Sequence, residues 1–273
     1  MVYESHMHTP LCRHARGEVV EYAAAAESRG LAGIIVTDHN PLPGGLAQGS
    51  RMYGEQLEAY LAMVEGARQA WRGRVDVRLG LECDYLPELE GFLAEQAGSA
   101  GFDFVLGSVH PHLDYYRERY WRGDAVAFQR QYFEHLAQAA ETGLFDSLAH
   151  PDLVRATTGD QWRIERVMDD ICRALDRIAA AGTAMELNTS GWRESFDEMK
   201  PGPAMLREMA LRGIDVTLGS DAHDPGRVGH GWEAALDLLE EVGYEGITVF
   251  LERKGRTVPI GEVRARLVAD VGS

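Results

Sequence analysis

Residues 33–39 read GIIVTDH, an apolar run that ends in three polar residues. A short, continuous apolar run of this kind is typical of a strand that is buried on both faces of a parallel sheet. Six further segments share this character: residues 2–8, 77–84, 104–110, 147–150, 184–188 and 216–220. The sequence therefore predicts seven buried strands.

Helical patterns lie between these strands. Residues 18–29 are rich in alanine and precede Gly30, a residue type common at helix C-termini. Comparable patterns occupy residues 56–71, 88–98, 124–142, 161–181, 203–212 and 232–242, with a further strand at 247–251 and a final helix at 261–268. Such alternation predicts an α/β fold with a parallel sheet, a barrel formed as one domain over residues 1–273. It does not settle whether the barrel closes.

The bulk composition excludes several classes of partner. The formal net charge is −16, so we expect neither nucleic acid nor an anionic membrane surface to bind. The three cysteines are widely spaced and give no disulfide framework. We find no secretory signal and no apolar run long enough for a membrane span, so a cytoplasmic location is expected. A homo-oligomer is left open.

Histidines collect at one end of the predicted strands. Seven of the ten lie at or just after the C-terminal end of a strand, which is where parallel barrels build their active sites. Glu82 and Asp221 occupy the same kind of position. The seven histidines are His6, His8, His14, His39, His110, His150 and His223.

This set predicts a metal centre. His6 and His8 are two residues apart on a strand, so both imidazoles point to the same face, and Asp221 and His223 form a second such pair. Imidazole and carboxylate ligands together suit zinc, iron or manganese. Nine ligands exceed what one ion can use, so we expect two or three divalent ions, with Glu82 as the bridging carboxylate.

The remaining histidines fit this scheme less simply. His135 falls in the helical pattern around residues 129–140 and is expected on the surface. Whether His112 lines the site is left open, and His230 is undecided. Cys83 should face away from the cluster, since it alternates with Glu82 along one strand.

Taken in order, the polar strand ends resemble a known motif series. The series consists of His6-Met7-His8-Thr9, His14, Thr37-Asp38-His39, Glu82, Gly107-Ser108-Val109-His110, His150-Pro151 and Gly219-Ser220-Asp221-Ala222-His223. It is similar to that of the PHP (polymerase and histidinol phosphatase) superfamily. Residues 186–191 with Arg193, and residues 150–153 with Arg155, most resemble the histidinol-phosphate phosphatases within it.

The resemblance implies a distorted (β/α)7 barrel with a metal cluster at the C-terminal ends of its strands. It implies one ion on His6, His8, Glu82 and Asp221, a second on Glu82, His110 and His150, and a third on His14, His39 and His223. Arg155 and Arg193, with His39, would contact the phosphate of a small phosphate monoester, and Glu82, Asp221 and His223 would be catalytic. The leaving group needs a proton or a metal, and the sequence does not choose among His223, Asp221 and a water on the third ion.

Residues 111–124 depart from the segment that is typical of histidinol-phosphate phosphatases, and Glu4 replaces an aspartate that is common before the first motif. L-Histidinol phosphate is therefore the first expectation for the substrate, with a sugar or nucleoside phosphate as the alternative. A non-catalytic metal-binding module is a weaker reading. A metal-dependent amidohydrolase normally has a lysine at a strand end as a bridging ligand. Neither Lys200 nor Lys254 ends a predicted barrel strand, which disfavours that class of enzyme.

Overall fold

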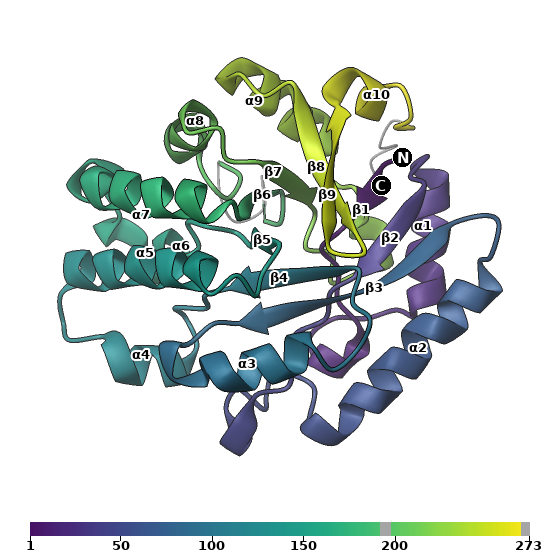
Figure 1. Ribbon diagram of the computed structural model, residues 1–273, viewed down its shortest axis with the longest axis horizontal. Helices are drawn as coiled ribbons and strands as arrows, with labels where there is room; N and C mark the ends of the chain where they lie inside the picture. The colour runs from purple at the N-terminus through teal and green to yellow at the C-terminus, as the bar shows by residue number, and fades with distance from the viewer. Residues whose placement is uncertain (192–197, 269–273) are drawn as a thin grey trace.

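The computed structural model describes residues 1–191 and 198–268. Seven parallel strands form one sheet in the order of the chain, and helices lie around the outside of it (Figure 1). The strands are β1 (Tyr3–Glu4), β2 (Gly33–Val36), β3 (Asp76–Asp84), β4 (Phe104–Ser108), β5 (Ser147–Leu148), β6 (Ala184–Asn188) and β7 (Val216–Gly219). All seven predicted strands are present, and the α/β barrel class is confirmed.

Helices follow the strands as the sequence pattern indicates. In α7, for example, the buried residues Ile171, Ala174, Leu175 and Ile178 recur at the spacing of one helix face. The helices are α1 (Val19–Ser28), α2 (Leu57–Ala70), α3 (Glu90–Ala97), α4 (Asp114–Tyr120), α5 (Ala125–Glu141), α6 (Val154–Thr158), α7 (Met168–Ala181), α8 (Pro203–Leu211), α9 (Trp232–Val242) and α10 (Ile260–Arg264).

Close packing of the first strands depends on Gly33. It lies opposite Tyr3 on β1 and Asp76 on β3. A Cβ atom at this position would come within 2.3 Å of both the Asp76 carbonyl oxygen and the Tyr3 ring. Only glycine lets the three backbones and the tyrosine ring share this space.

The barrel closes at the end where the polar residues lie. β1 and β7 do not pair as strands, but Met7 and Ala222, just beyond them, form a parallel bridge. The His8 amide donates to the Ala222 carbonyl at 2.9 Å, and the Ala222 amide donates to the His6 carbonyl at 3.0 Å. The two ends of the chain's sheet therefore meet beside the predicted metal ligands.

Three sequence expectations were incomplete or wrong. The segment predicted at 247–251 is the strand β8 (Gly246–Leu251), but it pairs antiparallel with β9 (Lys254–Pro259) in a separate hairpin. The short helices α4 and α6 were not predicted. His135 was expected on the surface, yet it is buried, because its ring packs on Tyr120 and hydrogen-bonds Tyr116 and Gln131.

No helix within residues 1–191 and 198–268 combines the length and the apolar character needed to cross a lipid bilayer.

Glu4 stabilises the seam of the barrel, which is where the segments that follow β1 and β7 meet. Its carboxylate is fully buried and accepts hydrogen bonds from the backbone amides of His6, Ser220 and Gly229, and from the Ser220 hydroxyl. Burial raises the pKa of Glu4, while these donors act in the opposite direction. The side chain thus joins the segments that follow β1 and β7 to the loop before α9.

We expect Glu4→Gln to lower the free energy of unfolding by about 2–3 kcal/mol, because the amide nitrogen would face amide donors and leave one of them unpaired. The measurement is urea unfolding of the metal-free protein. Glu95→Gln, on the exposed surface of α3, is the matched control and should change little. Equal stability of the two variants would contradict this role for Glu4.

Candidate metal centre and active site

Glu82, on β3, is the centre of the site. Its carboxylate is fully buried, and each oxygen faces its own group of histidines. Oε2 lies 3.5 Å from His6 Nε2, 3.7 Å from His8 Nε2 and 2.7 Å from His39 Nδ1. Oε1 lies 3.1 Å from His150 Nε2 and 3.5 Å from His110 Nε2. One carboxylate therefore faces both ligand groups, as a bridging ligand would.

Asp221 extends the first of these groups. Its Oδ1 lies 3.0 Å from His8 Nε2 and 3.5 Å from His6 Nε2. The ligand atoms of His6, His8 and Asp221 all lie within 4.8 Å of one another, and so do those of His6, Glu82 and His150. The geometry therefore brings together Glu82 of β3 and side chains from the segments that directly follow β1, β5 and β7.

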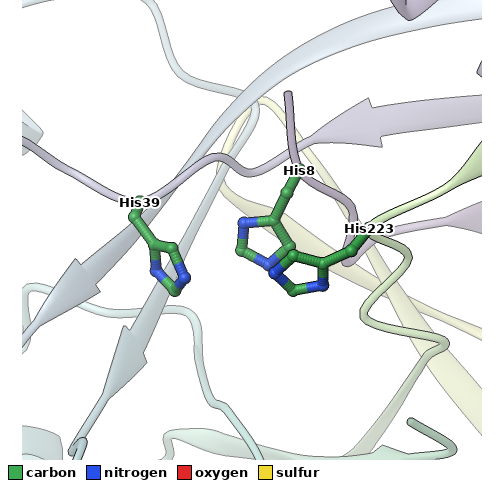
Figure 2. A group of neighbouring side chains, drawn as sticks. All are labelled: His8, His39 and His223. Atoms are coloured by element: carbon green, nitrogen blue, oxygen red, sulfur yellow. The ribbon is translucent and has the colours of Figure 1, made fainter. Parts of the chain in front are cut away.

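A third group lies beside these two. His8, His39 and His223 also place ligand atoms within 4.8 Å of one another, and Figure 2 shows their rings converging from different segments. The His8 and His223 rings are stacked with centroids 4.0 Å apart. His14 is more exposed, with its ring 4.6 Å from that of His223. All nine predicted ligands thus gather at one end of the barrel.

Three of the imidazoles are oriented by carboxylates behind them. His6 Nδ1 lies 2.7 Å from Glu186 Oε1, His8 Nδ1 lies 3.4 Å from Asp38 Oδ1, and His110 Nδ1 contacts Asp84. Such contacts fix the ring orientation and raise the basicity of a metal-binding nitrogen. Glu186 was not identified from the sequence as a partner of His6. An acidic residue in the middle of the buried strand β6 was the signal that could have indicated it.

Arg51 is a second residue that sequence reasoning missed. It comes from the loop between β2 and α2, is almost fully buried, and donates through Nε and Nη2 to the Asp84 carboxylate. Its Nη2 also lies 3.1 Å from His110 Nδ1. Because it belongs to no regular element, no periodic pattern marked it.

The electrostatics divide the histidines into two classes. Burial opposes protonation of His6 and His8, but the surrounding carboxylates outweigh it, so the pKa of His6 lies well above its usual value and that of His8 rises to about 9. Burial lowers the pKa of His223 to about 3. Burial and the Arg51 guanidinium hold the pKa of His39 well below its usual value. Neighbouring histidines offset burial and keep the Glu82 pKa well below its usual value.

The site has polar atoms that protein partners do not satisfy. His6 Nε2, Glu82 Oε2 and His223 Nε2 are buried and make no hydrogen bond within the described chain. Buried polar atoms normally have a partner, so unsatisfied atoms within these groups of histidines and carboxylates fit bound cations. Imidazole nitrogens with carboxylate oxygens suit a divalent transition-metal ion. The residues present therefore fit a divalent metal centre.

A cavity of about 500 Å³ opens over this centre. Its walls include His39, His150 and Asp221, together with His112, for which sequence had left the position open. Burial lowers the pKa of His112 to about 3, so its ring is neutral at physiological pH. Both Arg51 and Lys200 also line the cavity, although Lys200 ends no barrel strand.

Of the remaining sequence-predicted residues, Arg155 and His230 do not line this cavity. The Arg155 guanidinium donates to the Glu198 carboxylate and to the backbone carbonyls of Glu198 and Met199. Arg193 lies outside the described residues. His230 is partly buried, and its backbone carbonyl accepts from Thr189.

Two site residues adopt left-handed backbone conformations. His150 has φ 29° and Asp221 has φ 52°. Residues other than glycine rarely adopt such angles, and they are held there only when the surrounding structure over-determines them. At both positions the turn redirects the chain just after β5 or β7, so that the side chain points into the centre.

Comparison with known proteins assigns the family. The family model described as PHP domain matches residues 4–190, more than half of the chain. This chain belongs to the PHP domain family. The predicted resemblance is confirmed.

PHP relatives match along nearly the full chain. A probable histidinol-phosphatase of Deinococcus radiodurans is 39% identical, covering 92% of this chain and 97% of its own. A histidinol-phosphatase of Bacillus subtilis is 28% identical, covering 86% and 98%. The structure of a histidinol phosphate phosphatase from Lactococcus lactis, complexed with zinc, L-histidinol and phosphate, superposes with a TM-score of 0.76 at 20% identity, covering 93% and 98%. At this level of identity, the similarity to the Lactococcus lactis structure shows a shared fold.

We expect Asp84→Asn to weaken divalent-metal binding by roughly 10- to 100-fold, because it removes the charge that orients His110 and pairs with Arg51. Competition with a chromophoric chelator measures the affinity. Asp215→Asn, at an exposed position before β7, is the control and should retain wild-type affinity. Unchanged affinity in Asp84→Asn would show that the carboxylate does not support the centre.

Metal loading should release protons. At pH 7.5 the metal-free protein holds protons on His6 and His8, because their raised pKa values lie above that pH, whereas His39 and His223 are already neutral. A ligating imidazole nitrogen must lose its proton, so affinity should rise with pH through this range. Calorimetric titration with Zn²⁺ in buffers of different ionisation enthalpy measures the release. Heats independent of the buffer would contradict it.

Proposed function

We propose that this protein is a metal-dependent phosphomonoesterase that hydrolyses L-histidinol phosphate to L-histidinol and phosphate. The single observation that carries the proposal is the geometry of the buried Glu82 carboxylate. One of its oxygens faces one group of histidines, and the other oxygen faces a second group. The relatives at 39% and 28% identity bear the name histidinol-phosphatase and match nearly the whole chain. The reaction would serve histidine biosynthesis.

The proposed cofactor is a set of two or three divalent ions, of zinc, iron or manganese. The first would be held by His6, His8, Glu82 and Asp221, the second by Glu82, His110 and His150, and the third by His14, His39 and His223. When bound, such ions lower the pKa of water toward 7 and offset the charge of the phosphate. The zinc in the Lactococcus lactis structure supports this choice of metal.

The side chains around the centre divide the remaining work. Asp221 is ionised, because neighbouring His6 and His8 outweigh burial and hold its pKa well below its usual value. It is therefore suited to accept a proton rather than donate one. His223 is neutral, and its Nδ1 hydrogen-bonds the backbone carbonyl of Asp221, which fixes the orientation of the ring. Of the proposed phosphate contacts, His39 lines the cavity, Arg155 faces residues 198–199, and Arg193 stays a prediction.

The cavity wall supports a small organic phosphate. Leu113 and Leu153 supply apolar surface, and the neutral His112 ring supplies an aromatic face with a polar edge. These three residues suit an imidazole group. Leu113 and His112 lie in the segment 111–124 that departs from the family pattern, so a sugar or nucleoside phosphate is the alternative. The proposal includes a cytoplasmic setting and no nucleic acid or membrane partner.

The test is a panel of phosphate monoesters that includes L-histidinol phosphate, sugar phosphates, nucleoside monophosphates and p-nitrophenyl phosphate. We expect the highest kcat/KM for L-histidinol phosphate, because residues 112, 113 and 153 form an aromatic and apolar wall beside the centre. Chelation should abolish turnover, and added Mn²⁺, Zn²⁺ or Fe²⁺ should restore it. Preference for another ester would reassign the substrate. Chelator-resistant turnover would reject the metal mechanism.

A further inference from the structure

The chain contains only two lysines, and they lie in opposite surroundings. Lys254 is exposed on the β9 hairpin, whereas Lys200 is 7% exposed and lines the cavity over the metal centre. Burying an ammonium group is costly unless its surroundings offer it partners or a ligand. Its position next to the proposed reaction therefore calls for a functional account.

The backbone around Lys200 is fixed from three directions. Lys200 and Asn188, the last residue of β6, exchange two backbone hydrogen bonds of 2.7 and 3.0 Å. Arg155 donates to the Met199 carbonyl at 2.5 Å, on one side of Lys200. Asp152 accepts from the Gly202 amide at 2.9 Å, on the other side. The backbone is thus hydrogen-bonded at Lys200 and on both sides of it, although the segment lies outside the barrel sheet.

The side chain leads back to the metal centre. Lys200 Nζ donates to Ser190 Oγ at 2.7 Å, and Ser190 Oγ donates to Asp221 Oδ2 at 3.1 Å. The other oxygen of Asp221, Oδ1, faces His6 and His8. One hydroxyl group therefore separates the ammonium from a proposed metal ligand.

Within residues 1–191 and 198–268, Arg51 and Lys200 supply the only arginine or lysine side chains of this cavity wall. Arg51 gives two donors to the Asp84 carboxylate and one to the neighbourhood of His110, so its charge is already matched. Lys200 Nζ contacts the Ser190 hydroxyl. An ammonium carries three donors, so Nζ can contact an anion in the cavity while it keeps Ser190.

We infer that Lys200 binds the phosphoryl group of the substrate, as a point charge that contacts a non-bridging oxygen. This inference rests on the proposed phosphatase function. Lysine is a common phosphate ligand, and its charge complements a dianion. The same charge repels the ammonium group of an amino alcohol phosphate, so Lys200 also sets which end of the substrate enters the metal centre.

The first experiment compares Lys200→Met, Lys200→Arg and the control Lys254→Met, each loaded with metal. We expect Lys200→Met to raise the inhibition constant of inorganic phosphate and to lower kcat/KM, each by roughly 10- to 100-fold, as the loss of a charged hydrogen bond implies. Lys200→Arg should recover part of this loss. Lys254→Met should match the wild type. Unchanged phosphate inhibition in Lys200→Met would overturn the inference.

The leaving group separates phosphate binding from proton donation. An anion-binding role predicts the same loss for an alkyl phosphate and for p-nitrophenyl phosphate, whose leaving group needs no proton. A loss confined to the alkyl ester would overturn the inference and make Lys200 a proton donor. Metal content measured on the same samples should be unchanged. A Lys200→Met protein that has lost its metal would instead show a structural role and also overturn it.

A direct readout needs no turnover. In an NMR spectrum, protein that carries an isotope label at lysine gives signals from two side chains only, and the spectrum of Lys200→Met shows which signal belongs to Lys200. In the zinc-loaded protein, inorganic phosphate should shift the Lys200 signal and leave the Lys254 signal in place; a stationary Lys200 signal would count against binding. If the wild type binds phosphate through Lys200 but does not hydrolyse L-histidinol phosphate, the proposed substrate fails while this inference stands.

Discussion

The buried charge of Glu82 is the constraint on which the rest of the site depends. An isolated carboxylate in a protein interior costs several kcal/mol, so it persists only where charges or donors compensate it. Here five imidazoles surround its two oxygens, and further carboxylates stand behind the imidazoles. The result is a layered arrangement in which the rings of His6, His8 and His110 each have a carboxylate on both sides. Arg51 completes the outer layer behind His110. Moving any one layer would leave the next without its partner.

Much of this arrangement could be predicted from sequence, because polar residues at the C-terminal ends of buried parallel strands lie together on one face of the barrel. His6 and His8 follow from the two-residue period of an extended chain. Glu82 follows from its place at the end of an apolar strand among histidine-bearing strands. The parallel order of the sheet then places all these ends together. Closure of the barrel could not be predicted, since it rests on the bridge between Met7 and Ala222 and on the hydrogen bonds of Glu4, and a sequence pattern does not show how two distant segments meet.

Other features depend on tertiary contacts that leave no periodic signal. Arg51 and Lys200 lie in irregular segments, and nothing in their neighbouring residues distinguishes them from surface cations. His135 was misplaced because its helix has a wider buried face than the simple amphipathic pattern implies, with Gln129 and Tyr132 buried as well. The hairpin β8–β9 was half predicted, because the exposed and polar β9 lacks the apolar character of a buried strand. In each case a partner far away in the chain determines the environment.

The seam between the first and last barrel segments has a consequence for biosynthesis. His6 and His8 emerge from the ribosome early, but their partners Asp221 and His223 are more than 200 residues downstream. Contacts of such high sequence separation form late, since the intervening chain must first be ordered. A nascent chain that ends after β6 lacks Asp221 and His223, and therefore one side of the cluster. The side-chain cluster is therefore complete only once the segment that follows β7 has been made, and the first 220 residues alone cannot form it.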